Sequence, residues 1–172
     1  MKLDLDGAVC IAAGRWLVGV VCIAAGLSGC GDPREPFVGL YRGTGLFVVT
    51  LPDGSKQNDP LPSMEVQLTA PSDADRLVFA NGDCGLVADV TGGETFEILP
   101  RACPAEKIDV SDSSAPGSHF CTRNQTVDAG GGRLSGDTLE MNYRGAANIT
   151  GCTNGWADAR ATYTTTMTVT RL

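Results

Sequence analysis

The residues most able to do chemistry are seven cysteines and a single histidine, His119. A catalytic histidine needs a nucleophile and an orienting carboxylate, and no G-x-S-x-G turn or similar strained motif accompanies His119. A zinc site favours closely spaced ligands such as C-x-x-C, which the chain lacks. We therefore expect no enzymatic activity, no metal and no cofactor, and we expect the cysteines to serve structure rather than catalysis.

The composition is that of one acidic globular domain. The chain has 172 residues, of which 42% are hydrophobic and 19% charged, which is too apolar for disorder. Its formal net charge is −7 and no cluster of lysine and arginine interrupts the acidic surface, so nucleic acid is not an expected partner. An anionic membrane would repel the chain as well, so membrane attachment needs a cause other than charge.

The amino terminus has the layout of a secretory signal. The uncharged, mostly apolar run Trp16–Gly29 follows Arg15, and its length of about 21 Å as a helix is short of the ~30 Å hydrocarbon core. The run closes with Leu27-Ser28-Gly29-Cys30, which resembles the lipobox of bacterial lipoproteins. The resemblance implies cleavage before Cys30 and attachment of diacylglycerol to its thiol. The alternative is a conventional secreted protein.

The lipobox resemblance sets the expected boundaries and location. Residues 1–29 form the signal helix that is removed, residues 30–36 a lipidated tether, and residues 37–172 one β-barrel domain. Acyl chains on Cys30 would bury many CH₂ groups at ~0.8 kcal/mol each, so membrane anchoring is effectively permanent. In lipoprotein sorting an aspartate after the cysteine favours the inner membrane. Gly31 stands there, so we expect the outer membrane of the cell envelope.

A period-two alternation of apolar and polar residues recurs along the mature part and predicts an all-β domain. The clearest strand runs from Ala157 to Arg171, with odd positions mostly apolar and even positions mainly threonine. Seven further strands are expected at Phe37–Leu51, Met64–Thr69, Leu77–Phe79, Cys84–Val90, Phe96–Ile98, Thr122–Ala129 and Leu139–Tyr143.

Turn-forming residues separate these strands. They are Pro52-Asp53-Gly54, Asn81-Gly82-Asp83, Gly92-Gly93, Gly130-Gly131-Gly132 and Ser135-Gly136-Asp137. The segment Arg101–Phe120 is rich in Ser, Pro and Asp and reads as a longer loop. Eight strands with mostly short connections favour an eight-stranded antiparallel meander barrel whose first and last strands are the longest. A β-sandwich is the alternative.

Four cysteines remain for disulfide bonds once Cys10 and Cys22 leave with the signal and Cys30 takes lipid. An even number in an exported domain implies two disulfides with three possible pairings. In the expected strand order, Cys84–Cys103 and Cys121–Cys152 each bracket one hairpin, and all four cysteines lie at one end of the barrel. This pairing needs the shortest reach, and we therefore expect it.

Two features resemble the barrel closure of the lipocalin/calycin family. Gly39-Leu40-Tyr41 on the first strand is similar to that family's Gly-x-Trp, with tyrosine in place of tryptophan, and Arg171 lies in the inward phase of the last strand. The resemblance implies a cation–π contact between Tyr41 and Arg171 at the barrel bottom. The alternative is that Tyr41 is an ordinary core aromatic and Arg171 a solvated residue.

Two functions remain open from the sequence. The inward phase is rich in Phe, Leu, Met and Val, and it includes the small residues Gly43, Gly45, Ala157, Ala159 and Ala161. This composition predicts a cavity for a small apolar ligand. The alternative is an envelope protein-interaction module, an inhibitor or an assembly factor, that uses the barrel loops. The expected partners are the membrane, through the acyl chains on Cys30, and the apolar ligand or the envelope protein.

Overall fold

A computed structural model of the chain describes residues 31–80, 84–109, 119–153 and 157–172. A 3-10 turn, η1, spans Glu35–Phe37. The strands are β1 Gly39–Thr50, β2 Lys56–Thr69, β3 Leu77–Phe79, β4 Val87–Gly92, β5 Thr95–Ile98, β6 Arg101–Ala102, β7 Glu106–Asp109, β8 Phe120–Ser135, β9 Thr138–Thr150 and β10 Ala159–Arg171. No helix in these described ranges has the length and hydropathy of a membrane-spanning segment.

Eight of the strands form a closed antiparallel ring. Strands β1 to β5 pair in sequence order, β1 with β2 and so on to β4 with β5. Strand β5 then pairs with β8, β8 with β9, β9 with β10, and β10 pairs with β1 to close the ring. The eight ring strands follow the order that the sequence predicts, and the all-β antiparallel class is confirmed. The ring is not an even barrel, however.

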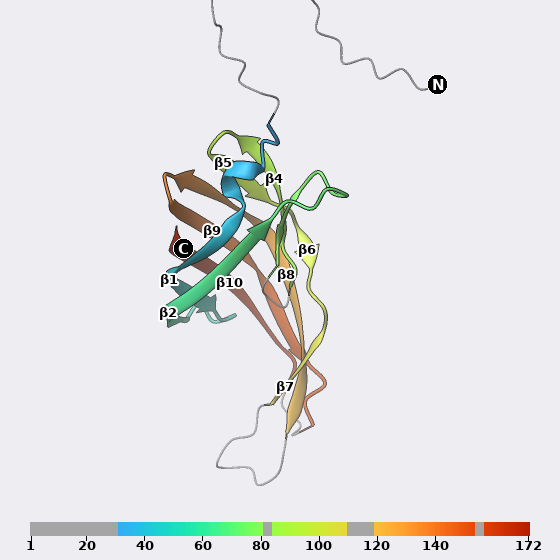
Figure 1. The fold of residues 1–172 in the computed structure, drawn as a ribbon. Helices are drawn as coiled ribbons and strands as arrows, with labels where there is room; N and C mark the ends of the chain where they lie inside the picture. The colour runs from blue at the N-terminus through green and yellow to red at the C-terminus, as the bar shows by residue number, and fades with distance from the viewer. Residues whose placement is uncertain (1–30, 81–83, 110–118, 154–156) are drawn as a thin grey trace, which may run out of the picture. The chain divides into compact units, whose positions relative to one another are not determined.

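The ring closes fully at one end only. Strands β1 and β10 pair along their length, from Tyr41↔Arg171 to Thr50↔Thr162, whereas β3 pairs with each neighbour over two residues. The short strands β3–β5 therefore complete the ring near η1, which we call the closed end. Figure 1 shows β4, β5 and η1 together at this end, and β7 at the other, where the long strands continue as a curved open sheet.

Strand β8 corrects the expected turn at Gly130-Gly131-Gly132. These glycines lie inside a continuous strand that ends at Ser135, and β8 is the longest strand of the described chain. A Cβ atom at Gly132 would lie 2.4 Å from Cζ of Phe96, and one at Gly130 would lie 2.5 Å from Cβ of Tyr143. The glycines are thus present because neighbouring side chains pack directly on the β8 backbone, not because the chain turns there.

The expectation that Arg101–Phe120 forms a loop is also partly wrong, because the segment contains two short strands. Strands β6 and β7 pair with the first part of β8, along the same edge of β8 with which β5 pairs nearer its carboxyl end. The Lys107 ammonium lies 3.9 Å from the centroid of the Phe120 ring, which adds a cation–π contact between β7 and β8. We call residues 101–109 the strap. Residues 110–118 lie outside the described residues. The expectation that the first and last strands are the longest is wrong as well, because β2 and β8 exceed both.

The apolar core fills the closed end. Phe37 of η1 is fully buried and meets the Phe96 ring edge-on, with centroids 5.5 Å apart. The ring strands contribute the other fully buried side chains of this core, among them Tyr41, Leu68, Leu77, Ile98 and Leu139. Burying a large apolar side chain stabilises the fold by roughly 1.5–3 kcal/mol, so this end is the stable base of the molecule.

Candidate ligand-binding cavity

A cavity of about 550 Å³ lies above the core, where the ring opens. Its walls come from β2, β9 and β10 on one side and from the β3–β4 region and the strap on the other. Its apolar lining consists of inward-facing side chains, including Met64, Val66, Phe79, Leu86, Met141 and Met167. The strap residues that line the cavity, Pro104, Ala105 and Glu106, are exposed, so a ligand could enter there without unfolding of the core.

Three methionines give the cavity its character. The strand register places Met167 directly opposite Met141 of β9, and Met64 lies across from Gly43 of β1. Methionine is unbranched and polarizable, so its side chain adapts to apolar groups of different shapes. The chain has four methionines in all, and the fourth is Met1. Every methionine within the described residues therefore lines this cavity.

The rim of the cavity is polar and belongs mainly to the strap and β8. Arg123 of β8 forms an ion pair with Glu106 of β7, and Gln125 lies two residues along β8. The strap is fixed beside them because the Cys103 amide donates to the Gln125 carbonyl oxygen over 2.8 Å. An apolar lining below a charged rim matches the chemistry of an amphipathic molecule.

Two disulfide bonds hold the open half of the ring. They join Cys84 to Cys103 and Cys121 to Cys152, with Cα separations of 4.5 Å and 4.1 Å, and this is the pairing expected from the sequence. Cys84 and Cys103 both line the cavity, so their bond fastens the strap to the start of β4. The Cys121–Cys152 bond joins the far ends of the β8–β9 hairpin instead and lines no part of the cavity.

Tyr41 and Arg171 meet at the closed end. They are direct partners in the β1–β10 register, and the Arg171 guanidinium carbon lies 5.4 Å from the centroid of the Tyr41 ring. Arg171 donates to the Tyr41 hydroxyl oxygen over 2.9 Å and to the Pro36 carbonyl oxygen, while the Tyr41 hydroxyl donates to the Phe37 carbonyl oxygen over 2.9 Å. The pair therefore fixes η1 across the bottom of the ring.

The small inward residues do not open the cavity, contrary to the expectation from the sequence. A Cβ atom at Gly43 would lie 2.1 Å from the Thr168 carbonyl oxygen, and one at Gly45 would lie 2.9 Å from the Met64 sulfur. The space beside both glycines is thus filled by β10 and β2. Ala157 and Ala159 are exposed beyond the ring, and Ala161 is half-buried.

An aromatic cluster lies beyond the cavity, on the inward phase of the open sheet. The Tyr163 ring has its centroid 5.4 Å from that of Phe47 and 6.3 Å from that of Tyr143. Its hydroxyl donates to the Thr126 carbonyl oxygen over 2.9 Å. Burial raises the pKa of the Tyr163 phenol, and a hydrogen bond with Gln125 partly opposes this shift. The phenol therefore stays neutral and anchors β10 to β8.

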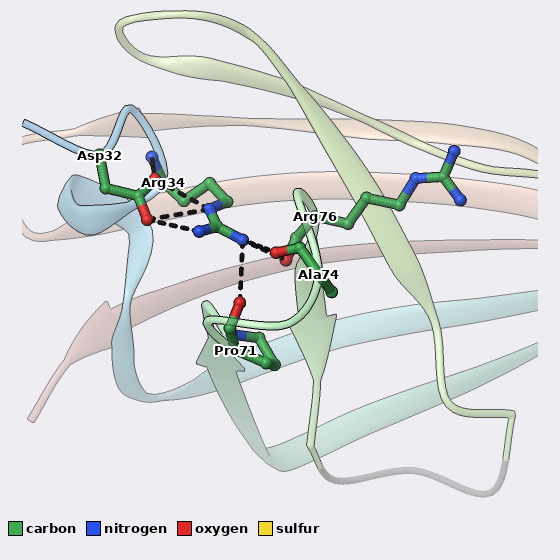
Figure 2. Close-up of polar contacts among 5 residues, drawn as sticks. All are labelled: Asp32, Arg34, Pro71, Ala74 and Arg76. Atoms are coloured by element: carbon green, nitrogen blue, oxygen red, sulfur yellow. Dashed lines mark hydrogen bonds and ion pairs between the residues drawn. The ribbon is translucent and has the colours of Figure 1, made fainter. Parts of the chain in front are cut away.

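The amino-terminal segment contains a polar network that sequence patterns did not indicate (Figure 2). The Arg34 guanidinium is held by both Asp32 carboxylate oxygens, at 2.6–3.0 Å, and donates to the Pro71 carbonyl oxygen over 3.2 Å and to the Ala74 carbonyl oxygen. It also donates to the Arg76 carbonyl oxygen over 3.4 Å. Residues 32–36, interpreted above as tether, are thus fastened to the β2–β3 connection. Cys30 and the rest of the segment that resembles a lipobox lie outside the described residues.

Within the described ranges, no three His, Cys, Asp or Glu side chains gather in a group that could hold a metal ion. Comparison of the chain with protein-family models, with curated proteins and with solved structures found no match. Any functional assignment therefore depends on the cavity and on the residues around it.

Proposed function

We propose that this protein is a non-enzymatic, lipid-anchored protein of the cell envelope whose ring binds a small amphipathic ligand. The single observation that carries the ligand-binding proposal is the methionine-rich cavity of about 550 Å³ with its charged rim. This volume falls within the range of about 300–1,000 Å³ that small-molecule sites occupy. Nothing in this proposal requires a cofactor, because the cavity offers shape and apolar surface rather than reactive groups.

The arrangement of the lining favours one orientation of the ligand. The apolar part would contact Met64, Met141 and Met167, and the polar group would reach the rim at Arg123 and Gln125. Arg123 is paired with Glu106, and the side chains of both are well exposed, so their ion pair contributes little stability and can open. A ligand carboxylate can then replace the Glu106 carboxylate on Arg123. The chemistry is that of a fatty acid or a similar amphiphile.

The barrel closure at Tyr41 and Arg171 supports the comparison with lipocalin-like carriers. The contact implied by that resemblance is present at the closed end, and neither residue of the pair lines the cavity. A ring sealed at one end and open at the other is suited to hold a small molecule. The lipobox at Leu27–Cys30 supports the anchor, and Gly31 after it favours the outer membrane.

The alternative, a protein-interaction module, finds less support in the sheet edges. The exposed edge of β2 beyond β3 is the place where a partner strand could add, but Pro60 and Pro62 interrupt it. Proline has no N–H to donate to a partner strand, and such residues protect natural edges from pairing. We therefore favour the cavity as the functional feature.

Titration with the fluorescent fatty acid 11-(dansylamino)undecanoic acid tests the ligand-binding proposal. We expect saturable binding with enhanced dansyl emission, and we expect Ala105→Trp to reduce it at least tenfold because the indole would fill the mouth. Ala102→Trp is the matched control, since Ala102 lies on the same strap, is exposed, and lines no part of the cavity. Equal binding by both variants, or none by the unaltered protein, would contradict the proposal.

A separate experiment tests the anchor. Cys30→Ser should abolish acylation and release the protein from the membrane fraction, and the intact mass of the unaltered protein should show the acyl groups. Membrane partition of Cys30→Ser equal to that of the unaltered protein would show that Cys30 is not the anchor.

A further inference from the structure

An apolar patch lies on the outside of the closed end. Val38, Leu40 and Leu172 are exposed by 38%, 36% and 66%. The Leu172 amide donates to the Leu40 carbonyl oxygen over 2.9 Å, so these two residues lie side by side. Leu40 has the outward phase of β1, opposite to that of buried Tyr41, and Val38, which directly precedes the strand, is exposed as well. Large exposed apolar side chains that gather together indicate a contact surface.

The chain that leads to this patch is fixed to the ring almost from its lipobox. The Arg34 side chain is only 13% exposed, and its guanidinium joins Asp32 to the β2–β3 connection (Figure 2). Three residues later Phe37 is buried in the core, and the Pro36 carbonyl oxygen accepts from Arg171. The contacts hold the chain from Asp32 onward, which leaves Gly31 as the one linking residue after Cys30.

The reach of this link decides which end of the molecule can approach a membrane. Two steps along the chain separate Cys30 from Asp32, and they span at most about 8 Å. An acyl group on Cys30 would therefore hold the closed end against the lipid headgroups. Near the patch Arg42 pairs with Glu65 and Arg34 pairs with Asp32. Glu35 is exposed and acidic, so contact with lipid would depend on the acyl anchor and the apolar side chains and not on charge.

We infer that the closed end docks directly on the lipid bilayer, with Val38, Leu40 and Leu172 in its interfacial region and the cavity mouth directed away from it. The inference rests on the proposed acylation of Cys30. In this arrangement the protein is held in a fixed orientation and does not move freely on a tether. A ligand would then be exchanged with the aqueous compartment or with a partner there, and not with the membrane to which the protein is bound.

The same strand supplies a matched control for this geometry. Leu46 is also an outward-facing leucine of β1, and it is exposed by 38%. It is six residues farther from the closed end than Leu40, which corresponds to about 20 Å along a strand. A direct contact of the closed end with lipid predicts that Leu40 touches the bilayer and Leu46 does not.

Fluorescence quenching by brominated lipids tests the inference. The full-length protein, expressed so that it is processed by the cell, carries Trp156→Phe together with Leu40→Trp, Val38→Trp or Leu46→Trp. Each variant is reconstituted in phosphatidylethanolamine/phosphatidylglycerol vesicles with and without brominated acyl chains. Intact mass reports acylation, and circular dichroism reports folding.

We expect bromine to reduce the emission of the Leu40→Trp and Val38→Trp proteins at least twofold and to leave that of the Leu46→Trp protein nearly unchanged. Acylated protein with equal quenching at positions 40 and 46, or with none at positions 38 and 40, would overturn the docking and leave the anchor standing. Protein without acyl groups would overturn the anchor and the docking together, while fatty-acid binding by the cavity would be measured independently.

Discussion

Several glycines in this ring leave room for a neighbouring backbone or side chain that a Cβ atom would exclude. Gly145 of β9 shows this most clearly, because a Cβ atom there would lie 1.8 Å from the Thr126 carbonyl oxygen and 2.8 Å from the Tyr163 hydroxyl. The Tyr163 phenol crosses over this glycine to reach Thr126. From the sequence alone, an inward glycine indicates empty space, whereas in the structure it indicates close packing of backbone against backbone.

The substitution Gly145→Ala should therefore destabilise the protein. The added methyl would collide with backbone that cannot move without breaking the β8–β9 pairing, and overpacking of this kind costs about 1–3 kcal/mol or more. Gly93→Ala is the control, because a Cβ atom at Gly93 would have no neighbour within 4 Å. Chemical denaturation measures both. A loss of stability in Gly93→Ala as large as that in Gly145→Ala would contradict this explanation.

The raised pKa of Tyr163 predicts a dependence of stability on alkaline pH. The folded protein holds the phenolic proton more tightly than the unfolded chain, whose tyrosine pKa is about 10. This contribution to stability is fully present below about pH 10 and is lost as the pH rises through the folded-state pKa. Tyr163→Phe should make the free energy of unfolding fall less steeply above about pH 10. An unchanged slope in that variant would show that another group is responsible.

Secondary-structure elements differ in how far the sequence predicts them. Strand β10 carries a regular alternation of apolar and polar residues and was expected with nearly its observed bounds. Strand β9 was expected only over Leu139–Tyr143, whereas it extends to Thr150. The strap was missed, because β6 and β7 are short and attach to β8 without a buried face of their own. The glycines of β8 were misread for a related reason. Glycine marks a turn and a close approach equally, and only the partner strand distinguishes them.

The two disulfides give the elements of the open half different roles, and this difference can be measured. By chain entropy, removal of either bond should destabilise the fold by roughly 3 kcal/mol. Of the two disulfide bonds, only Cys84–Cys103 joins the strap to the cavity wall. The double variant Cys84→Ala/Cys103→Ala should therefore also weaken binding of the dansyl fatty acid several-fold, while Cys121→Ala/Cys152→Ala should bind as the unaltered protein does. Equal effects of the two double variants on binding would contradict a role of the strap in holding the ligand.

At the scale of the whole molecule, the ring is a stable closed base that carries an open, adaptable upper half. The sequence was sufficient for the all-β class and the order of the ring strands, whereas the contact between Tyr41 and Arg171 was implied only by the lipocalin/calycin resemblance. The cavity could be predicted only as an inward apolar surface, because its position depends on where β3–β5 end and on how the strap crosses. The Arg34 network was outside the reach of any pattern, since three of its acceptors are backbone carbonyls of a connection far along the chain.

The central claim is that an amphipathic ligand binds among the three cavity methionines, and methyl NMR tests it most directly. With ¹³C-labelled methionine methyl groups, the domain should give one signal each for Met64, Met141 and Met167, assigned by single Met→Leu variants. Addition of a fatty acid should shift all three signals together, with one common saturation curve. Saturable binding that leaves these signals in place would contradict the account, because the ligand would then lie outside the ring.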